Sequence, residues 1–352
     1  MDFDFVLRGE IPHPASLMIR REFFGTGSFK LTVDGARDGF EPLERDRVLY
    51  FPARPELAML VTRVSRTGTR LTADGTLLKG LARRRVCLPP LKPGGDYGQF
   101  GYDLFTGDAE SAYLHYAQAN LTDPEEPRRR IPNLALAQNL HRGIELPWQA
   151  RFERLSDLFS DIGQATGLGW DIRPDFDARR FVFAAWAGED RTRGVRRCAL
   201  SRALGNAPEG TVTDDAASAV TAIYAGGAGE DENRLILAFG GEESGLARYE
   251  AFEDCGSIDD ADMLRMAAGR KLAPPGRSMT LEVLDGGLCR YGRDYDVGDV
   301  VTAICGDWRM DARLVAMEES WERGARSLKA TFGDPPMGVT ELIRRGQRGA
   351  VR

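Results

Sequence analysis

Histidine and cysteine, which supply many catalytic nucleophiles, bases and zinc ligands, are scarce in this sequence. Its 352 residues include only three histidines: His13, His115 and His141. The five cysteines never form a Cys-x-x-Cys pair, and the sequence contains neither a His-Glu-x-x-His nor a Gly-x-Ser-x-Gly motif. An odd number of widely separated cysteines indicates reduced thiols in a chain made in a cytoplasm. They are Cys87, Cys198, Cys255, Cys289 and Cys305.

The sequence also lacks long apolar runs and a net positive charge. No stretch approaches the roughly 18 consecutive apolar residues of a membrane-spanning helix. The acidic start, MDFDFVLRGE, has no apolar segment of signal-peptide length. Lys and Arg number 47 against 53 Asp and Glu, a net charge of −6. Because coating nucleic acid requires a positive field, this charge disfavours that role, and we expect no stable membrane insertion.

Glycine and proline, in contrast, are abundant. Forty Gly and eighteen Pro are spread along the chain, which indicates many turns and therefore many short strands. The length suits two or three domains. Apolar and β-branched runs predict strands over residues 3–8, 16–20 and 29–33, and Asp34-Gly35 is a hairpin signal after the last of them.

A weak internal repeat links the two ends of the sequence. Each copy contains three short apolar runs closed by Gly and Asp, a pattern typical of an antiparallel meander. The first copy is marked by Asp46-Arg47-Val48, Leu60-Val61 and Gly68 to Gly75, and the second by Asp299-Val300, Leu314-Val315 and Gly324 to Gly333. We expect two small β-modules that enclose the rest of the chain.

Helical spacing of apolar residues predicts three helices between these modules: 108–120 with Asp108 as N-cap, 150–166 ended by Gly167, and 258–272 with Ser257 and Asp260 at its start. Strands are expected over 134–140, 168–172, 180–186, 220–224, 234–239 and 281–284, and one helical turn over 77–82. The predicted fold is mainly β with α+β insertions. Its segments are an N-terminal β-barrel module (1–86), a linker with a helix (87–149), an α+β insertion (150–217), a second β-barrel module (218–333) and a flexible tail (334–352).

Candidate catalytic and binding residues have simpler structural interpretations. His115 is expected on a helix surface, His13 in a proline-flanked loop and His141 at a strand end, so none is placed beside a nucleophile. The spacing of Asp294, Asp296 and Asp299 does not fit a calcium loop and predicts a polar turn. Asp259-Asp260 is explained by a helix N-terminus. The sequence therefore predicts no catalytic, cofactor-binding or metal site.

Two glycine-rich stretches are candidates for phosphate-binding loops. Gly25-Thr-Gly27 lacks a third glycine and a following helix, which favours a hairpin turn. Ala225 to Gly229 precedes the acidic Glu230-Asp231-Glu232, which would repel phosphate, and favours a flexible loop. Two arginine runs, 83–85 and 128–130, are expected to be solvated or to pair with acidic neighbours such as Glu125 and Glu126. In an assembling protein they could instead pair across a subunit boundary.

Several of these stretches together resemble the siphovirus hub proteins of tail tips and baseplates, a family of phages and prophages of Gram-positive hosts. The resemblance spans roughly residues 3–333 and depends on the pattern and order of segments. The segments are Thr69 to Arg85, Asp108 to Leu121 with Ile131 to Leu134, Phe152 to Leu158 with Thr166 to Trp170, Tyr224 to Gly229, and Tyr295 to Gly333.

The resemblance implies a tail-hub fold in which three chains close a ring around the tail axis. The implied partners are the distal tail or tail-tube protein, the tape-measure protein and the tail-fibre or receptor-binding proteins, with DNA only in passage through the lumen. The implied location is the virion, assembled in the host cytoplasm. Some related hubs carry a C-terminal peptidase or lytic extension. This sequence ends nineteen residues after Gly333, so we expect no such domain and no enzymatic activity.

Two other functions stay open at this point. A tail-associated cell-wall hydrolase would have to use carboxylates, given the few histidines. A monomeric carbohydrate-binding module would serve host recognition and would bind sugar as an isolated chain.

Overall fold

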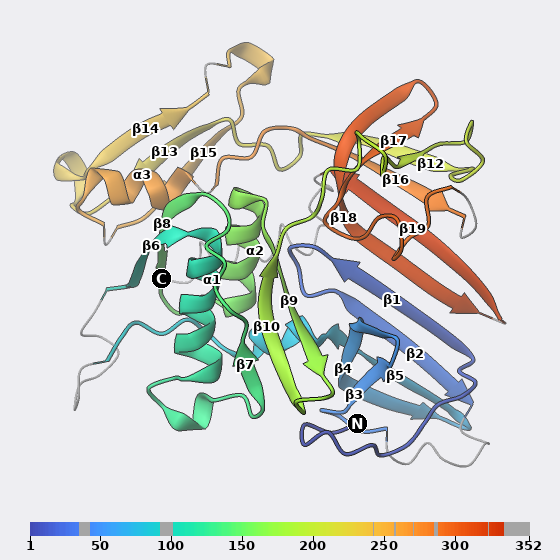
Figure 1. The fold of residues 1–352 in the computed structure, drawn as a ribbon. Coiled ribbons are helices and arrows are strands. Elements are labelled where there is room, and N and C mark those ends of the chain that lie inside the picture. Colours follow the sequence, from blue (N-terminus) through green and yellow to red (C-terminus); the bar gives the residue numbers. More distant parts are fainter. Residues whose placement is uncertain are drawn as a thin grey trace. The chain divides into compact units, whose positions relative to one another are not determined.

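The structure, a computed structural model, describes residues 1–34, 43–91, 101–241, 243–256, 258–269, 271–284, 288–322 and 324–333. These residues form nineteen strands and three α-helices, so the prediction of a mainly β fold is confirmed. The chain divides into two compact units (Figure 1). Of the described residues, the first unit comprises 1–209 and 281–330, and the second comprises 210–280 and 331–333. The closure of each module into a barrel stays a prediction.

The main sheet of the first unit joins the N-terminal and C-terminal parts of the chain. Its strand order is β19-β18-β1-β2-β5-β4-β3, and β17 pairs with β18 beside this path. The joining pair is β1 with β18, antiparallel, with Ser16 opposite Glu322 and Glu22 opposite Ala316. The strands are β1 (Ser16–Glu22), β2 (Ser28–Asp34), β3 (Val48–Phe51), β4 (Arg54–Thr67), β5 (Arg70–Leu77), β17 (Val300–Cys305), β18 (Trp308–Glu322) and β19 (Ala325–Gly333).

Alternating burial shows which face of this sheet points to the core. In β1 and β2, every second side chain is buried, as expected for strands with one covered face. Ile19, Phe29 and Val33 from these strands pack with Leu57 and Met59 of β4. The predicted strands at 16–20 and 29–33 are confirmed. Gly35 of the expected hairpin signal lies outside the described residues.

The internal repeat is confirmed by matching hydrogen bonds. In the first copy, β3-β4-β5 is an antiparallel meander. The Asp46 N–H donates to the Val61 carbonyl, and the Val61 N–H donates to the Arg47 carbonyl. In the second copy, the Gly298 N–H donates to the Leu314 carbonyl, and the Leu314 N–H donates to the Asp299 carbonyl. The φ angle is positive at both Asp46 (65°) and Gly298 (101°). Figure 1 shows the copies as the blue β3–β5 and the orange to red β17–β19.

An α+β segment fills residues 101–186 of the first unit. Helices α1 (Ala109–Ala117) and α2 (Leu155–Thr166) lie side by side and cover one face of the sheet β7-β10-β9 (Figure 1). Their shared core is aromatic, with Tyr113, Phe159, Trp170 and Phe183 all fully buried. The remaining elements are β6 (Asp103–Asp108), β7 (Leu134–Leu136), β8 (Glu145–Ala150), β9 (Gly169–Asp175), β10 (Arg180–Trp186), a π-helical turn η2 (Gln118–Thr122) and a 3-10 helix η3 (Pro127–Arg129).

Helix α1 begins where the sequence predicts. Asp108 caps it, because its carboxylate accepts a 2.8 Å hydrogen bond from the Ser111 N–H. The α-helix ends at Ala117 and η2 continues the coil to Thr122, just before Pro124.

The predicted start of α2 is wrong by five residues. Ala150 ends β8, opposite Asp103 of β6. Phe152 then has a left-handed φ of 57° and a half-exposed side chain, so it does not share the buried face of the helix. The predicted end is confirmed, since Gly167 has φ 72° and its N–H donates to the Gly163 carbonyl.

The predicted strand at residues 3–8 is also wrong, because this segment contains turns and irregular backbone. Phe3 and Phe5 instead pack on Phe181 of β10, with ring centroids 5.1 and 4.7 Å away. Their alternate spacing therefore reflects burial against the α+β segment without any strand pairing.

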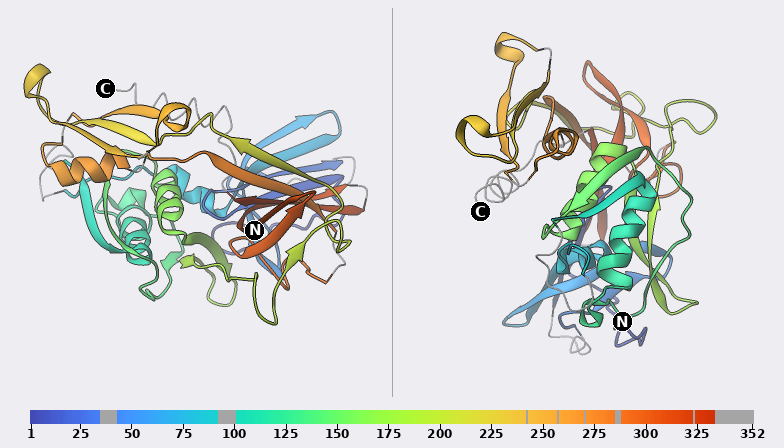
Figure 2. Two further views of the ribbon diagram at one scale, coloured as in Figure 1. Left: turned by 90° about the horizontal axis from the view of Figure 1, so that it is seen from above. Right: turned by 90° about the vertical axis from the view of Figure 1, so that its left-hand side faces the viewer.

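The second unit contains a small sheet, β14-β13-β15, with α3 (Ala261–Gly269) packed on one face (Figure 2). Ile223 and Ala225 of β13 meet Leu264 and Ala268 of α3 in its core. The predicted helix over 258–272 is shorter than expected, and Asp260 caps it through a 2.8 Å bond from the Met263 N–H. Ser257, the other predicted cap, lies outside the described residues. The strands of this unit are β12 (Gly210–Asp215), β13 (Ala222–Gly226), β14 (Ile236–Gly240) and β15 (Glu250–Asp254). Strand β16 (Gly276–Val283) begins in the second unit and ends in the first.

Candidate functional site

The three histidines have structural surroundings. His115 lies on the surface of α1, where its Nε2 is 2.9 Å from Asp103 Oδ1 and its ring stacks on Phe105 at 4.7 Å. His13 is exposed in the loop before β1. The His115 ring also lies 4.9 Å from the Tyr116 ring. These contacts fix His115 between a carboxylate and two aromatic rings, and no serine, threonine or cysteine is recorded among its contacts in the described part of the chain.

His141 lies in the one arrangement that superficially resembles a catalytic triad. Ser111 Oγ donates to Asp108 Oδ2 at 2.7 Å, and His141 Nδ1 is 3.1 Å from the same oxygen and 3.4 Å from Ser111 Oγ. In a catalytic triad, one ring nitrogen of the histidine contacts the acid and the other ring nitrogen contacts the nucleophile. Here the same nitrogen, His141 Nδ1, faces both Asp108 and Ser111. The cluster is therefore not a triad, and it serves as the N-cap of α1. Burial raises the pKa of Asp108, but hydrogen bonds from Ser111 and His141 outweigh it and hold that pKa below its ordinary value.

The acidic residues before β17 form the predicted polar turn, and each carboxylate has a different neighbour. Asp294 accepts from the Arg290 N–H at 2.8 Å, Asp296 binds Arg21, and Asp299 accepts from the Glu189 N–H at 2.7 Å. Among the described residues, no group of three or more His, Cys, Asp or Glu side chains is arranged to hold a metal ion.

The two glycine-rich stretches differ. Gly25-Thr-Gly27 turns the chain between β1 and β2, which confirms the hairpin prediction. The prediction of a flexible loop at Ala225 to Gly229 is wrong for Ala225 and Gly226, whereas Gly227 to Gly229 lie outside the strands. Its first residues end β13, the Gly227 N–H donates to Leu235, and the Ala228 N–H donates to Ile258.

A buried carboxylate connects the two copies of the repeat. Glu319 of β18 is 1% exposed and accepts two 2.8 Å hydrogen bonds from the Arg54 guanidinium of β4. Arg326 of β19 donates a third at 2.6 Å. This geometry is the bidentate Arg–carboxylate pair, which fixes orientation as well as charge. Because Arg54 and Glu319 lie 265 residues apart, no local pattern in the sequence indicates this link.

A second buried cation, Arg21, joins β1 to the turn before β17. It donates to Asp296 Oδ1 at 2.6 Å and to the Tyr291 hydroxyl at 3.0 Å. Its guanidinium also lies 6.0 Å from the centre of the Trp186 ring. Burial lowers the pKa of Arg21, but Tyr291 and Asp296 outweigh it and raise the pKa above its ordinary value.

The chain beyond β1 is held by Lys79, which follows the first copy in the 3-10 helix η1 (Leu78–Arg84). Its Nζ donates to the carbonyls of Glu22 and Phe23 at 2.9 and 3.0 Å and lies 4.6 Å from the centre of the Trp170 ring. Trp170 Nε1 donates to the next carbonyl, that of Phe24, at 2.8 Å. Burial lowers the pKa of Lys79 to about 7. A lone lysine inside the apolar sequence Leu77-Leu-Lys-Gly-Leu81 was a signal for this buried cation.

The two arginine runs meet in the first unit, at the ends of η1 and η3. Arg85 Nε donates to the Arg129 carbonyl at 2.6 Å, and the Arg129 guanidinium donates to the carbonyl of Val86 at 2.6 Å. Glu125, expected to pair with the second run, instead accepts a 2.9 Å hydrogen bond from the Leu91 N–H.

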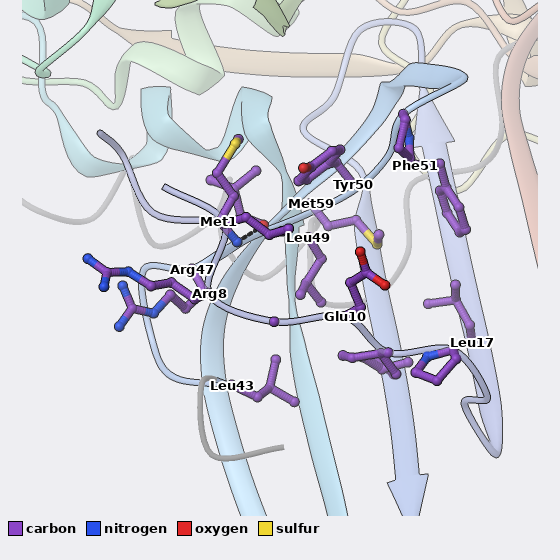
Figure 3. Close-up of a pocket in the computed structure, with 17 residues that line it drawn as sticks. Met1, Arg8, Glu10, Leu17, Leu43, Arg47, Leu49, Tyr50, Phe51 and Met59 are labelled. Atoms are coloured by element: carbon purple, nitrogen blue, oxygen red, sulfur yellow. Dashed lines mark hydrogen bonds between the residues drawn. The ribbon is translucent and has the colours of Figure 1, made fainter. Parts of the chain in front are cut away.

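One apolar pocket lies between the N-terminal segment and the first copy of the repeat (Figure 3). Its volume is about 330 Å³. Leu17, Leu49 and Met59 contribute apolar walls. The ionisable groups of the lining are those of Arg8, Glu10, Arg47, Tyr50 and the Met1 amino terminus. Among the described residues, the lining holds a single carboxylate, that of Glu10, whereas glycoside hydrolysis by carboxylates uses two.

Comparison with known families now places the chain. The model of the Siphovirus ReqiPepy6 Gp37-like protein family matches residues 1–334. The chain belongs to this family. The resemblance to siphovirus proteins is therefore confirmed over nearly the whole sequence. A comparison with curated proteins gives no match.

Three solved structures share the fold at low sequence identity. One is the 43 kDa tail protein of prophage MuSo2 from Shewanella oneidensis, with 10% identity, a TM-score of 0.55, and 91% of this chain and 94% of that chain covered. The prophage tail protein gp18 from Listeria monocytogenes has 12% identity, a TM-score of 0.52 and coverage of 97% and 95%. A tail protein from Neisseria meningitidis has 15% identity, a TM-score of 0.53 and 92% coverage of both. This siphovirus-family chain thus has the fold of prophage tail proteins. Among the described residues, no helix is long and apolar enough to cross a membrane.

Proposed function

We propose that the protein is a structural hub of a phage or prophage tail, which joins the tail tube to the host-recognition components at the tail tip or baseplate. The observation that carries this proposal is the internal repeat. Three chains with two matching meanders each would present six near-equivalent positions, which lets a closed homotrimeric ring meet a sixfold tail tube. Siphovirus family membership and the tail-protein fold support the same role.

The proposal assigns work to each part of the chain. Residues 1–86 and 218–333 contain the ring-forming modules, residues 87–217 are insertions, and residues 334–352 form a tail. The partners are the distal tail or tube protein, the tape-measure protein and the tail-fibre or receptor-binding proteins, with DNA passing through the lumen. The protein acts in the virion, after assembly in the host cytoplasm, and performs no catalysis.

The test is the molar mass from light scattering across a size-exclusion peak, with negative-stain images of the same fraction. The chain mass is 38.8 kDa, and we expect three times this value and a ring with a central hole. A monomer that binds cell-wall sugars would favour the carbohydrate-binding module. Clearing of peptidoglycan in a zymogram would favour the hydrolase.

A further inference from the structure

Six arginines from two separate runs, Arg83–Arg85 and Arg128–Arg130, lie together in the first unit, and we call them the arginine face. Arg85 and Arg129 are partly buried where the runs touch. The other four side chains are exposed around them. Two runs 43 residues apart in the sequence, between the last residue of one and the first of the other, thus form one basic surface.

The positive charge of this surface is only partly balanced within the first unit. Arg84 pairs with Asp46, but among the described residues no ion pair is recorded for Arg83, Arg128 or Arg130. Burial is the main cause of the lowered pKa of Arg85, and repulsion from Arg129 and Arg84 lowers that pKa further. Like charges held this close favour binding of an anion that spans both runs.

The chain itself contains a matching acidic surface in its second unit. Residues 210–280 hold thirteen Asp and Glu against six Lys and Arg, a net charge of −7, although the whole chain has a net charge of −6. Two acidic groups lie close together there, because the Ala228 N–H donates to the Ile258 carbonyl just before each group. We call them the acidic face: Glu230, Asp231, Glu232, Asp259, Asp260 and Asp262, all exposed.

We propose that the arginine face of one chain binds the acidic face of a second copy. This inference rests on the proposed ring and supplies one of its contacts. A head-to-tail pairing of two different surfaces closes into a ring when the rotation between copies allows it. Guanidinium groups suit carboxylates because their fork donates two parallel hydrogen bonds. A second copy is favoured over nucleic acid because the acidic complement is present in the same chain.

The experiment uses the full chain with charge reversals at exposed side chains only. The first variant carries R83E, R128E and R130E, and the second carries E230K, E232K and D259K. The third combines all six substitutions. A matched control carries R193E, R196E and R197E, three exposed arginines of a loop in the same unit. Thermal unfolding of each variant verifies that it folds.

Light scattering at about 0.15 M salt then compares molar masses. We expect wild type and control at three times the chain mass, and a threefold lower molar mass for the first and second variants. The third variant, with all six substitutions, should recover the wild-type molar mass. If the first variant loses the trimer mass and the third variant does not recover it, the acidic face is not the partner of the arginine face. A wild-type mass in the first variant overturns the inference and leaves the ring intact. A monomeric wild type would instead overturn both. Loss of duplex-DNA binding by the first variant at unchanged mass would assign the arginine face to nucleic acid.

Discussion

The two copies of the meander repeat their backbone and differ in what surrounds it. In the first copy, the left-handed residue before the opening strand is Asp46, whose side chain is 61% exposed and pairs with Arg84. In the second copy it is Gly298, where an added Cβ would lie 2.3 Å from the Phe23 ring. Both positions require a positive φ, but only the second excludes a side chain. The backbone hydrogen bonds define the repeat, and the neighbours determine the residue type.

The far halves of the central strands differ in the same way. In β4, the pairing with β3 ends at Leu60, so among the described residues, residues 63–67 pair only with β5. Their side chains are partly or fully exposed. In β18, residues 316–322 pair with β1, and Glu319 is buried. A neighbouring strand thus converts an exposed half-strand into the contact between the copies.

Removing the carboxylate of this contact should have the largest effect. Glu319→Ala leaves Arg54 and Arg326 partly buried without their shared partner, which should lower the free energy of unfolding by about 3–5 kcal/mol. Urea denaturation measures this difference. Glu318→Ala, one residue earlier in the same strand, is the control and should cost less than about 1 kcal/mol. Equal losses would show that the buried ion pair does not hold the copies together.

Gly298→Ala tests the steric difference between the copies. The new Cβ meets Phe23 in a backbone with positive φ, so overpacking and strain together should cost about 3 kcal/mol. The same denaturation assay applies. The matched change Asp46→Ala, on the exposed copy, should cost about 1 kcal/mol, because only backbone strain and a surface ion pair are involved. If the two substitutions cost the same, the close approach of Phe23 is not a constraint.

The buried Lys79, in the segment that follows the first copy, should make the free energy of unfolding depend on pH. Its pKa is about 7 in the folded chain and about 10.4 in an unfolded one. Below pH 7 both states hold the proton, and the cost of burying the charge is present in full. Between these values the unfolded state binds more protons, so the free energy of unfolding rises with pH by up to about 1.4 kcal/mol per unit. Relative to wild type, Lys79→Met should remove this rise between about pH 7 and 10, as measured by urea denaturation across that range. A parallel pH dependence in both proteins would contradict the assignment.

Asp46→Gly should have the smallest effect. Glycine adopts the left-handed backbone without strain, which offsets the loss of the exposed ion pair with Arg84, so the change in free energy of unfolding should stay within about 0.5 kcal/mol. A thermal shift assay beside Asp46→Ala is sufficient. A clear loss for glycine would show that the Asp46 side chain contributes more than its backbone position.

The sequence predicted what local chemistry controls. The caps at Asp108 and Gly167 and the two meanders follow from residues close to each other in the chain. The strand prediction for residues 3–8 is wrong because Phe3 and Phe5 alternate like a strand, while their partner Phe181 is far away in the sequence. The sequence does not predict strands β6 and β8, because their segments have too little apolar character.

The polar contacts of the candidate site cannot be predicted from the sequence either, because their partners are also far apart in it. Arg21 and Asp296 lie 275 residues apart, and each looks like an ordinary charged residue in its own segment. Only the pairing of β1 with β18 places them together. For Lys79 the apolar neighbours in the sequence are a local signal of burial, but the sequence analysis predicts only a helical turn there.

The pairing of β1 with β18 also has a consequence for synthesis on the ribosome. The N-terminal hairpin emerges early, but the strand that covers the outer edge of β1 is roughly 300 residues later, which at 5–20 residues per second means about 15–60 s of translation. During that time, the edge of β1 presents unpaired backbone groups beside the apolar Leu17 and Ile19. The nascent chain therefore needs either a temporary cover for this edge or slow enough encounters to avoid aggregation before its last strands arrive.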